Sequence, residues 1–275
     1  MSNVVSVFPT THIIHSHQFL VLEMTKVSLA IGLKGLFSVL GTLMVVTLLY
    51  TLFTDGFPFR MDLLTPWMIA TLIDFYINVI PFAIWVTYKE SNCLISILWI
   101  ILLICLGSIT TCAYIVSQFV KLSSQESSQD PVYYALLRHP NKSGTEPKRE
   151  LSFVVTLRII FSILGLFMFG TLVYTIVTDG SPFRMELLTP WLTTTLVDFY
   201  INIVALAVWV AYKESSWISS VFWIILLISF GSITACVYIV WQLFQISSQD
   251  PVYLVLVRRG DRAENKYKGL PGEAI

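Results

Sequence analysis

The stretch "TDGFPFRMDLLTPW" at residues 54–67 returns as "TDGSPFRMELLTPW" at residues 178–191. Each copy separates two strongly apolar stretches, where a connector ordinarily tolerates almost any polar sequence. The Asp-Gly and Pro residues favour a turn, and Thr-Pro-Trp supplies an N-cap, a proline for the first helical position and an aromatic ring for the headgroup level. The repeat therefore predicts two connectors that position the helices after them in the same way.

The composition predicts an all-α integral membrane bundle. The chain has 275 residues, of which 56% are hydrophobic and 12% are charged, whereas soluble domains carry about 25% charged residues. The formal net charge is zero, so no nucleic-acid partner is indicated. The expected partner is the lipid bilayer, with a small solute or an ion as a possible ligand. The arginine-free N-terminal segment favours an endomembrane or the plasma membrane over a plastid.

The apolar runs predict six transmembrane helices, because about 20 apolar residues cross a bilayer. They lie near residues 28–53, 67–88, 94–120, 152–177, 191–212 and 217–244.

The six runs form two tandem copies of three, since a residue in the first half matches the one 124 positions later. "YKES" at 88–91 and 212–215 and "GSIT" at 107–110 and 231–234 illustrate the match. The predicted organisation is an N-terminal tail (1–26), a first repeat (27–138), a polar linker (139–150), a second repeat (151–258) and a C-terminal tail (259–275).

Three crossings per copy is an odd number, which predicts that the second repeat is inverted relative to the first. The alternative is one re-entrant segment per copy, which makes the repeats parallel. In the inverted arrangement the basic residues divide almost evenly between the two faces, so the positive-inside rule orients the chain only weakly, with both termini in the cytosol. The sequon "NKS" at 141–143 tests this orientation.

Acidic residues inside apolar spans are the strongest functional signal, because a carboxylate at the centre of a helix costs about 2.5 to 3.5 kcal/mol on insertion scales. Each repeat carries one such acid, followed by an amide one helical turn later, and a tyrosine in its third span at a similar depth. We expect these groups to form one polar transport site per repeat. The candidate residues are Asp74, Asn78 and Tyr114 in the first repeat, and Asp198, Asn202 and Tyr238 in the second.

The same residues also fit a structural role, in which they join helices by hydrogen bonds of about 0.6 kcal/mol each. Pro81 has Ala205 as its counterpart, so a kink is expected in the second span alone.

The connector residues Arg60, Trp67, Arg184 and Trp191 are candidates for structural or interfacial roles. Local pairing of the two arginines with Asp62 and Glu186 is favoured over pairing with the intramembrane acids.

Recognisable catalytic and cofactor motifs are lacking from the sequence. It contains no phosphate-binding glycine loop, HExxH motif or CxxC pair. We therefore expect no cofactor, no metal site and no catalytic residues, and an enzyme is disfavoured.

The tandem "TDGxPFRM(D/E)LLTPW", "DFYIN", "YKES" and "SSQDPVY" blocks resemble a plant family of multi-pass membrane proteins classed as a domain of unknown function. The resemblance covers residues from about 27 to 260 and implies a plant source and membrane residence. It implies no activity, ligand or catalytic residue.

Three classes of function remain open from the sequence. The first is a channel or transporter for a small solute, ion or proton that uses the intramembrane Asp and Asn residues. The second is a non-catalytic membrane scaffold or assembly factor. The third is an intramembrane enzyme acting on lipid, which requires Asp and Tyr groups at a cleft open to lipid.

Overall fold

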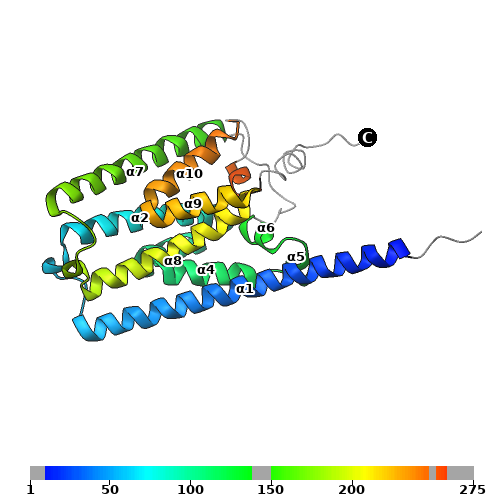
Figure 1. The fold of residues 1–275 in the computed structure, drawn as a ribbon, viewed down its shortest axis with the longest axis horizontal. Helices are drawn as coiled ribbons and strands as arrows, with labels where there is room; N and C mark the ends of the chain where they lie inside the picture. The colour runs from blue at the N-terminus through cyan, green and yellow to red at the C-terminus, as the bar shows by residue number, and fades with distance from the viewer. Residues whose placement is uncertain (1–9, 138–149, 248–251, 259–275) are drawn as a thin grey trace, which may run out of the picture.

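The structure, a computed structural model, describes residues 10–137, 150–247 and 252–258, and these residues are all helical or in connecting turns (Figure 1). The all-α prediction is confirmed for them. The first half contains α1 (Thr10–Asp55), η1 (Met61–Leu63), α2 (Pro66–Lys89), α3 (Cys93–Leu106), α4 (Ser108–Val120), α5 (Ser124–Gln129) and α6 (Pro131–Leu136). The second contains α7 (Glu150–Asp179), η2 (Met185–Leu187), α8 (Pro190–Lys213), α9 (Trp217–Phe230), α10 (Ser232–Phe244) and η3 (Val252–Val255).

The predicted domain boundaries are only partly accessible in this structure. Helix α1 runs unbroken from Thr10 past residue 26, so the predicted N-terminal tail does not end at a helix boundary. Most of the predicted linker and the C-terminal tail lie outside the described residues.

The prediction of six spanning helices needs correction. Within the described residues, four helices are long and apolar enough to cross a membrane: α1, α2, α7 and α8. The third apolar run of each repeat is instead divided at a glycine, Gly107 or Gly231, into helices of 14 and 13 residues. Each of these is shorter than the roughly 20 residues that cross a bilayer.

The repeated connectors start their helices as the sequence predicts. The side chains of Thr65 and Thr189 accept hydrogen bonds from the backbone N–H groups of Met68 and Leu192, and a proline occupies the first helical position in each case. This arrangement satisfies one of the free N–H groups at each helix start. Helix α2 then continues unbroken through Pro81.

The two short helices of each repeat fold back on one another as a hairpin. Glu90 follows the end of α2, yet its carboxylate accepts a hydrogen bond from Tyr114 in α4 at 3.0 Å. Glu214 and Tyr238 repeat this contact at 2.9 Å. The chain therefore travels inward along α3 or α9 and returns along α4 or α10, so each hairpin begins and ends at one face of the bundle. We call this the hairpin face, and the ends of α2 and α8 lie there (Figure 1).

Both repeated connectors lie together at the opposite face, which we call the connector face. The hydroxyl oxygens of Thr51, near the end of α1, and Thr194, near the start of α8, are 2.6 Å apart. Leu63, Met68, Trp191 and Leu192 form one apolar cluster that joins the two connectors. The inverted-repeat prediction is therefore wrong. Because the third run of each repeat turns back, each repeat runs from face to face twice, and the two repeats point the same way.

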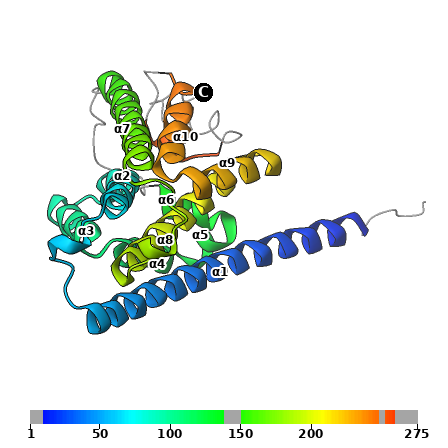
Figure 2. The ribbon, with the colours of Figure 1, turned by 60° about the vertical axis from the view of Figure 1, so that its left-hand side comes forward.

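The two repeats are interlocked rather than side by side. Helix α1 packs along α4 of its own repeat and also along α8, while α7 packs along α10 and along α2 (Figure 2). Helices α2 and α8 contact each other at the centre. The buried core accordingly draws residues from both halves, including Phe75 and Val79 from α2 and Phe199 and Ile203 from α8.

Candidate functional site

The hairpin tips are sharp turns that only glycine adopts readily. Gly107 has φ 54° and ψ −127°, and Gly231 has φ 53° and ψ −127°. A Cβ atom on Gly107 would lie 2.3 Å from Oδ2 of Asp198, and one on Gly231 would lie 2.5 Å from Oδ2 of Asp74. Glycine is therefore required twice at each tip, once for the backbone conformation and once for the close approach of a carboxylate.

Asp74 and Asp198 each cap the hairpin of the other repeat. Oδ1 of Asp198 accepts a hydrogen bond from the backbone N–H of Ser108, the first residue of α4, at 2.7 Å. Oδ1 of Asp74 accepts one from the backbone N–H of Ser232, the first residue of α10, at 2.8 Å. A carboxylate at a helix N-terminus is stabilised by the free N–H groups and by the helix dipole. The acids thus join the repeats reciprocally.

The amides one turn beyond the acids have no protein partner. Asn78 and Asn202 have no exposed surface, and neither the oxygen nor the nitrogen of either side chain is hydrogen-bonded. The side-chain hydroxyl of Thr111 is also buried without a hydrogen-bond partner. A polar group left unpaired in the interior costs about 1 to 3 kcal/mol. An amide both donates and accepts hydrogen bonds, and a water molecule is able to serve as either partner.

The predicted tyrosines do not hydrogen-bond to Asp74 or Asp198 but to two other carboxylates. Tyr114 and Gln118 donate to Oε1 of Glu90 at 3.0 and 3.5 Å. Tyr238 and Gln242 donate to Oε1 of Glu214 at 2.9 and 3.1 Å. The proposed cluster of acid, amide and phenol is therefore divided, because the acids lie at the tips and the tyrosines bind carboxylates that lie just after α2 and α8.

Sequence reasoning missed Glu90, Glu214 and the glycines as the residues that shape the hairpins. The signals were present in the repeated "YKES" and "GSIT" blocks. The third apolar runs, at 94–120 and 217–244, are also longer than a crossing requires and carry Gly-Ser near their middles.

The connector arginines pair locally, but with partly different acids from the predicted Asp62 and Glu186. Arg60 lies 3.0 Å from Asp55 and 3.8 Å from Asp62, and Arg184 lies 2.9 Å from Asp179. The closest partner is thus the last residue of the preceding helix, α1 or α7. This contact ties each connector to the helix it follows.

Trp67 and Trp191 pack inward rather than towards the surroundings. They are only 8% and 6% exposed. Their role in the structure is packing at the connector face, where Trp191 joins the apolar cluster of the two connectors.

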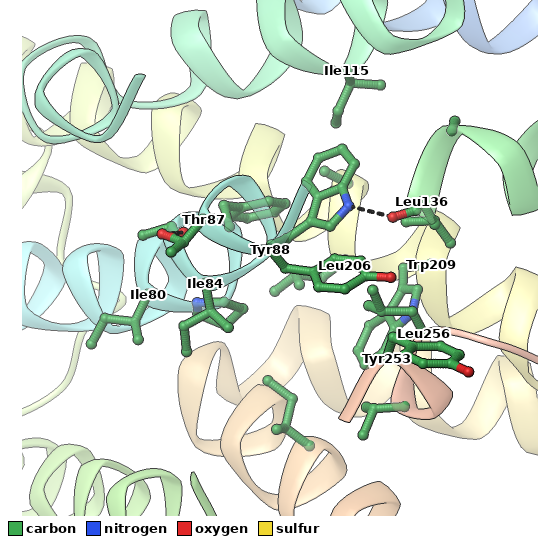
Figure 3. Close-up of a pocket in the computed structure, with 18 of the residues that line it drawn as sticks. Ile80, Ile84, Thr87, Tyr88, Ile115, Leu136, Leu206, Trp209, Tyr253 and Leu256 are labelled. Carbon is green, nitrogen blue, oxygen red and sulfur yellow. Dashed lines mark hydrogen bonds between the residues drawn. The ribbon is translucent and has the colours of Figure 1, made fainter. Parts of the chain in front are cut away.

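A cavity of about 530 Å³, which we call the central cavity, lies between the repeats. Its walls come from α1, α2, α4, α6, α7, α8, α10 and η3 and are almost entirely apolar (Figure 3). Ile80, Ile84 and Tyr88 from α2 line it together with Leu206 and Trp209 from α8. The nitrogen of Trp85 donates to the carbonyl of Leu136 at 3.0 Å, whereas that of Trp209 has no partner. Cavities of this size and lining commonly hold small apolar ligands.

The acids and the central cavity are separate features. None of Asp74, Asn78, Asp198 and Asn202 lines it. A second cavity, of about 620 Å³, is lined by residues of α2 and α3 with Leu64 of the connector and Phe167 of α7, and it also lacks these four residues. The geometry thus offers two distinct features, a pair of capped hairpin tips and an apolar chamber.

Comparison with protein families gives one finding. A family model described as "Protein of unknown function (DUF1475)" matches residues 24–263. Comparisons with curated proteins and with solved structures give no match.

Proposed function

We propose that this chain, which belongs to the DUF1475 family of proteins of unknown function, is a four-span membrane protein that binds a lipid-like apolar molecule in its central cavity. The observation that supports this proposal is the cavity of about 530 Å³ with apolar walls from both repeats. An apolar cavity does not hold water well, and a hydrocarbon chain is the natural occupant within a bilayer.

Membrane placement is supported by the outward surfaces of the helices as well as by their lengths. Leu94, Leu98 and Ile101 on α3, and Trp217 and Phe222 on α9, are all exposed. Large apolar side chains over such an area are unfavourable in water and favourable in lipid. The four long helices then cross the bilayer, and the hairpins enter it from one side and return.

The parallel arrangement also orients the chain. Of the nine lysines and arginines in the described residues, Arg60 and Arg184 lie at the connector face and are paired with acids. The other seven lie at the hairpin face: Lys26, Lys34, Lys89, Lys121, Arg158, Lys213 and Arg258. By the positive-inside rule the hairpin face is cytosolic, and so are the start of α1, the end of α6 and the start of α7.

The orientation gives a direct expectation for glycosylation. Asn141 lies outside the described residues, but α6 before it and α7 after it both meet the hairpin face, so we expect it to stay unmodified when the chain is made in microsomes. A sequon engineered by lengthening the 180–186 connector is expected to be glycosylated, since that face is lumenal. Modification of Asn141 together with a bare connector sequon would reverse the orientation.

Ligand binding is tested by filling the cavity. Ala83 lines it, whereas its counterpart in the other repeat, Ala207, does not, and both are partly buried on the same turn of their helices. Ala83→Phe is expected to reduce lipid retained by the purified protein by at least about tenfold, because a ring occupies space that the chain needs. Ala207→Phe serves as the matched control for added bulk.

The readout is native mass spectrometry after delipidation and exposure to vesicles of defined phospholipids. Thermal unfolding of both variants shows whether each remains folded. Equal lipid retention by wild type and a folded Ala83→Phe protein would refute the proposal.

Transport of a proton or small polar solute is the second candidate. The observation in its favour is the set of wholly buried, unpartnered amides of Asn78 and Asn202, one turn from Asp74 and Asp198. Acids inside a membrane commonly mark proton or ion pathways. Flux in reconstituted vesicles, compared between the native chain and the Asp74→Asn and Asp198→Asn variants, separates this candidate from a structural role.

A further inference from the structure

The central cavity lies in the half of the bundle next to the hairpin face. Its walls come from the hairpin-face ends of the long helices, such as Leu33 of α1, Leu157 of α7 and Tyr88 of α2. Residues of α6 and η3, which lie beyond the ends of the hairpins, complete it. A chain that entered the cavity would therefore keep its polar end at the hairpin face.

Basic residues follow several of the lining residues in sequence. Lys34 follows Leu33, Lys89 follows Tyr88 and Arg158 follows Leu157, while Arg258 lies two residues beyond Leu256. The cavity itself is apolar, so these cations border it without entering the wall. Four cations thus lie at the hairpin-face end of the cavity, on a face that also carries Glu90, Glu126, Asp130 and Glu214.

Three of these cations, Lys89, Arg158 and Arg258, donate to carbonyl oxygens, which carry no formal negative charge. Arg158 donates through one nitrogen to the carbonyls of Leu243 and Ile246, each at 2.8 Å. Its Nε is buried and has no partner. Lys89 and Arg258 likewise donate to the carbonyls of Tyr134 and Tyr212, at 2.8 and 2.9 Å.

Resting on the proposed function, we infer that the occupant of the central cavity is an anionic amphiphile: a single acyl chain in the cavity with a carboxylate or phosphate at the hairpin face. Lys34 and Arg158, which occupy equivalent positions in the two repeats, supply the charge for it. A neutral headgroup gains nothing from these cations, so the site discriminates by charge as well as by the tail. A free fatty acid and an anionic phospholipid share this chemistry.

The probes are 9,10-dibromostearate and its methyl ester, which share one tail and differ in charge. Trp85 and Trp209 line the cavity, so a bound bromine-bearing chain quenches their fluorescence. Titrations use the full-length protein in neutral detergent micelles. The acid is expected to bind at least about fivefold more tightly than the ester, a ratio that corresponds to about one basic residue near a charged headgroup.

Substitutions that remove one positive charge show which residues cause the preference for the acid over the ester. Lys34→Gln and Arg158→Gln are each expected to weaken binding of the acid about fivefold and to leave binding of the ester unchanged. Arg158→Lys keeps the charge and should restore acid binding if Arg158→Gln weakens it. Arg60→Gln, at the connector face, is the control and should alter neither titration.

The outcomes distinguish the preference for a charged headgroup from binding of the apolar tail. Equal binding of acid and ester by the native chain overturns the charge preference and leaves the apolar site standing. Quenching by neither probe overturns both. Competition by vesicles of phosphatidylserine, but not phosphatidylcholine, identifies a phospholipid as the source of the anionic group, whereas competition by oleate alone identifies a free fatty acid.

Discussion

Gly107→Ala is expected to lower the free energy of unfolding by about 2 to 6 kcal/mol, or to prevent folding altogether. An alanine at φ 54° is strained by about 1 to 3 kcal/mol. Its Cβ would also lie 2.3 Å from Oδ2 of Asp198 and 2.8 Å from the ring of Phe75, and such overpacking costs about 1 to 3 kcal/mol more. Gly231→Ala is expected to behave in the same way.

Unfolding is followed in detergent with a thiol-reactive dye, because Cys112 and Cys236 are buried. The exposed Cys93 and Cys105 are first replaced by serine to remove background reaction. Gly170→Ala is the control, since nothing lies within 4 Å of its Cβ position, and it should leave stability unchanged or raise it by up to about 1 kcal/mol.

A second substitution separates the two contributions to the stability loss of Gly107→Ala, which are backbone strain and the close contact with Asp198. Adding Asp198→Ala removes the closest contact and should recover part of the loss, while the backbone strain remains. If the single variant unfolds with the stability of wild type, the tip is not the tight turn described above.

Asp198→Leu is expected to destabilise the chain by about 1 to 5 kcal/mol, and Asp198→Asn by much less. Leucine leaves the backbone N–H of Ser108 without its acceptor, at about 1 to 3 kcal/mol. It also removes a charge from a helix N-terminus, worth about 0.3 to 2 kcal/mol. Asparagine keeps the acceptor that Ser108 uses at 2.7 Å and loses only the charge.

The same unfolding assay measures both variants, and Asp74→Leu and Asp74→Asn repeat the comparison at the other tip. Asp62→Leu is the control, because the Asp62 side chain is 71% exposed in the connector. If Asp198 serves only to cap the hairpin, this graded loss of stability is expected. A proton or ion site predicts instead that Asp198→Asn folds normally and loses flux, so the pair of measurements decides between the roles.

The sequence predicted much of the local structure correctly for physical reasons that act over a few residues. Thr65 and Thr189 cap their helices because a side-chain oxygen can reach an N–H three residues along. Arg60 pairs locally because its neighbours on the connector are acids. These contacts need no knowledge of the rest of the chain.

The candidate site was predicted only in part, because its contacts join residues far apart in the chain. Asp74 reaches Ser232 and Asp198 reaches Ser108, so the acids belong to the hairpin of the opposite repeat. Hydrophobic periodicity gives the face on which a side chain lies, but it does not identify the helix that packs there. Tyr114 was placed with Asp74 from its depth and from the face of its helix, and neither of these distinguishes Asp74 from Glu90.

The sequence by itself determined the apolar helices, their starting caps and the twofold repetition of the chain, since these follow from composition, spacing and local hydrogen bonding. The tertiary structure alone decided that the repeats are parallel. The largely apolar run of 27 residues at 94–120 satisfies its backbone equally well as one long helix or as two short ones. The choice falls at Gly107, where a carboxylate from the other repeat caps the new helix. That acceptor becomes available only when the two repeats have packed together.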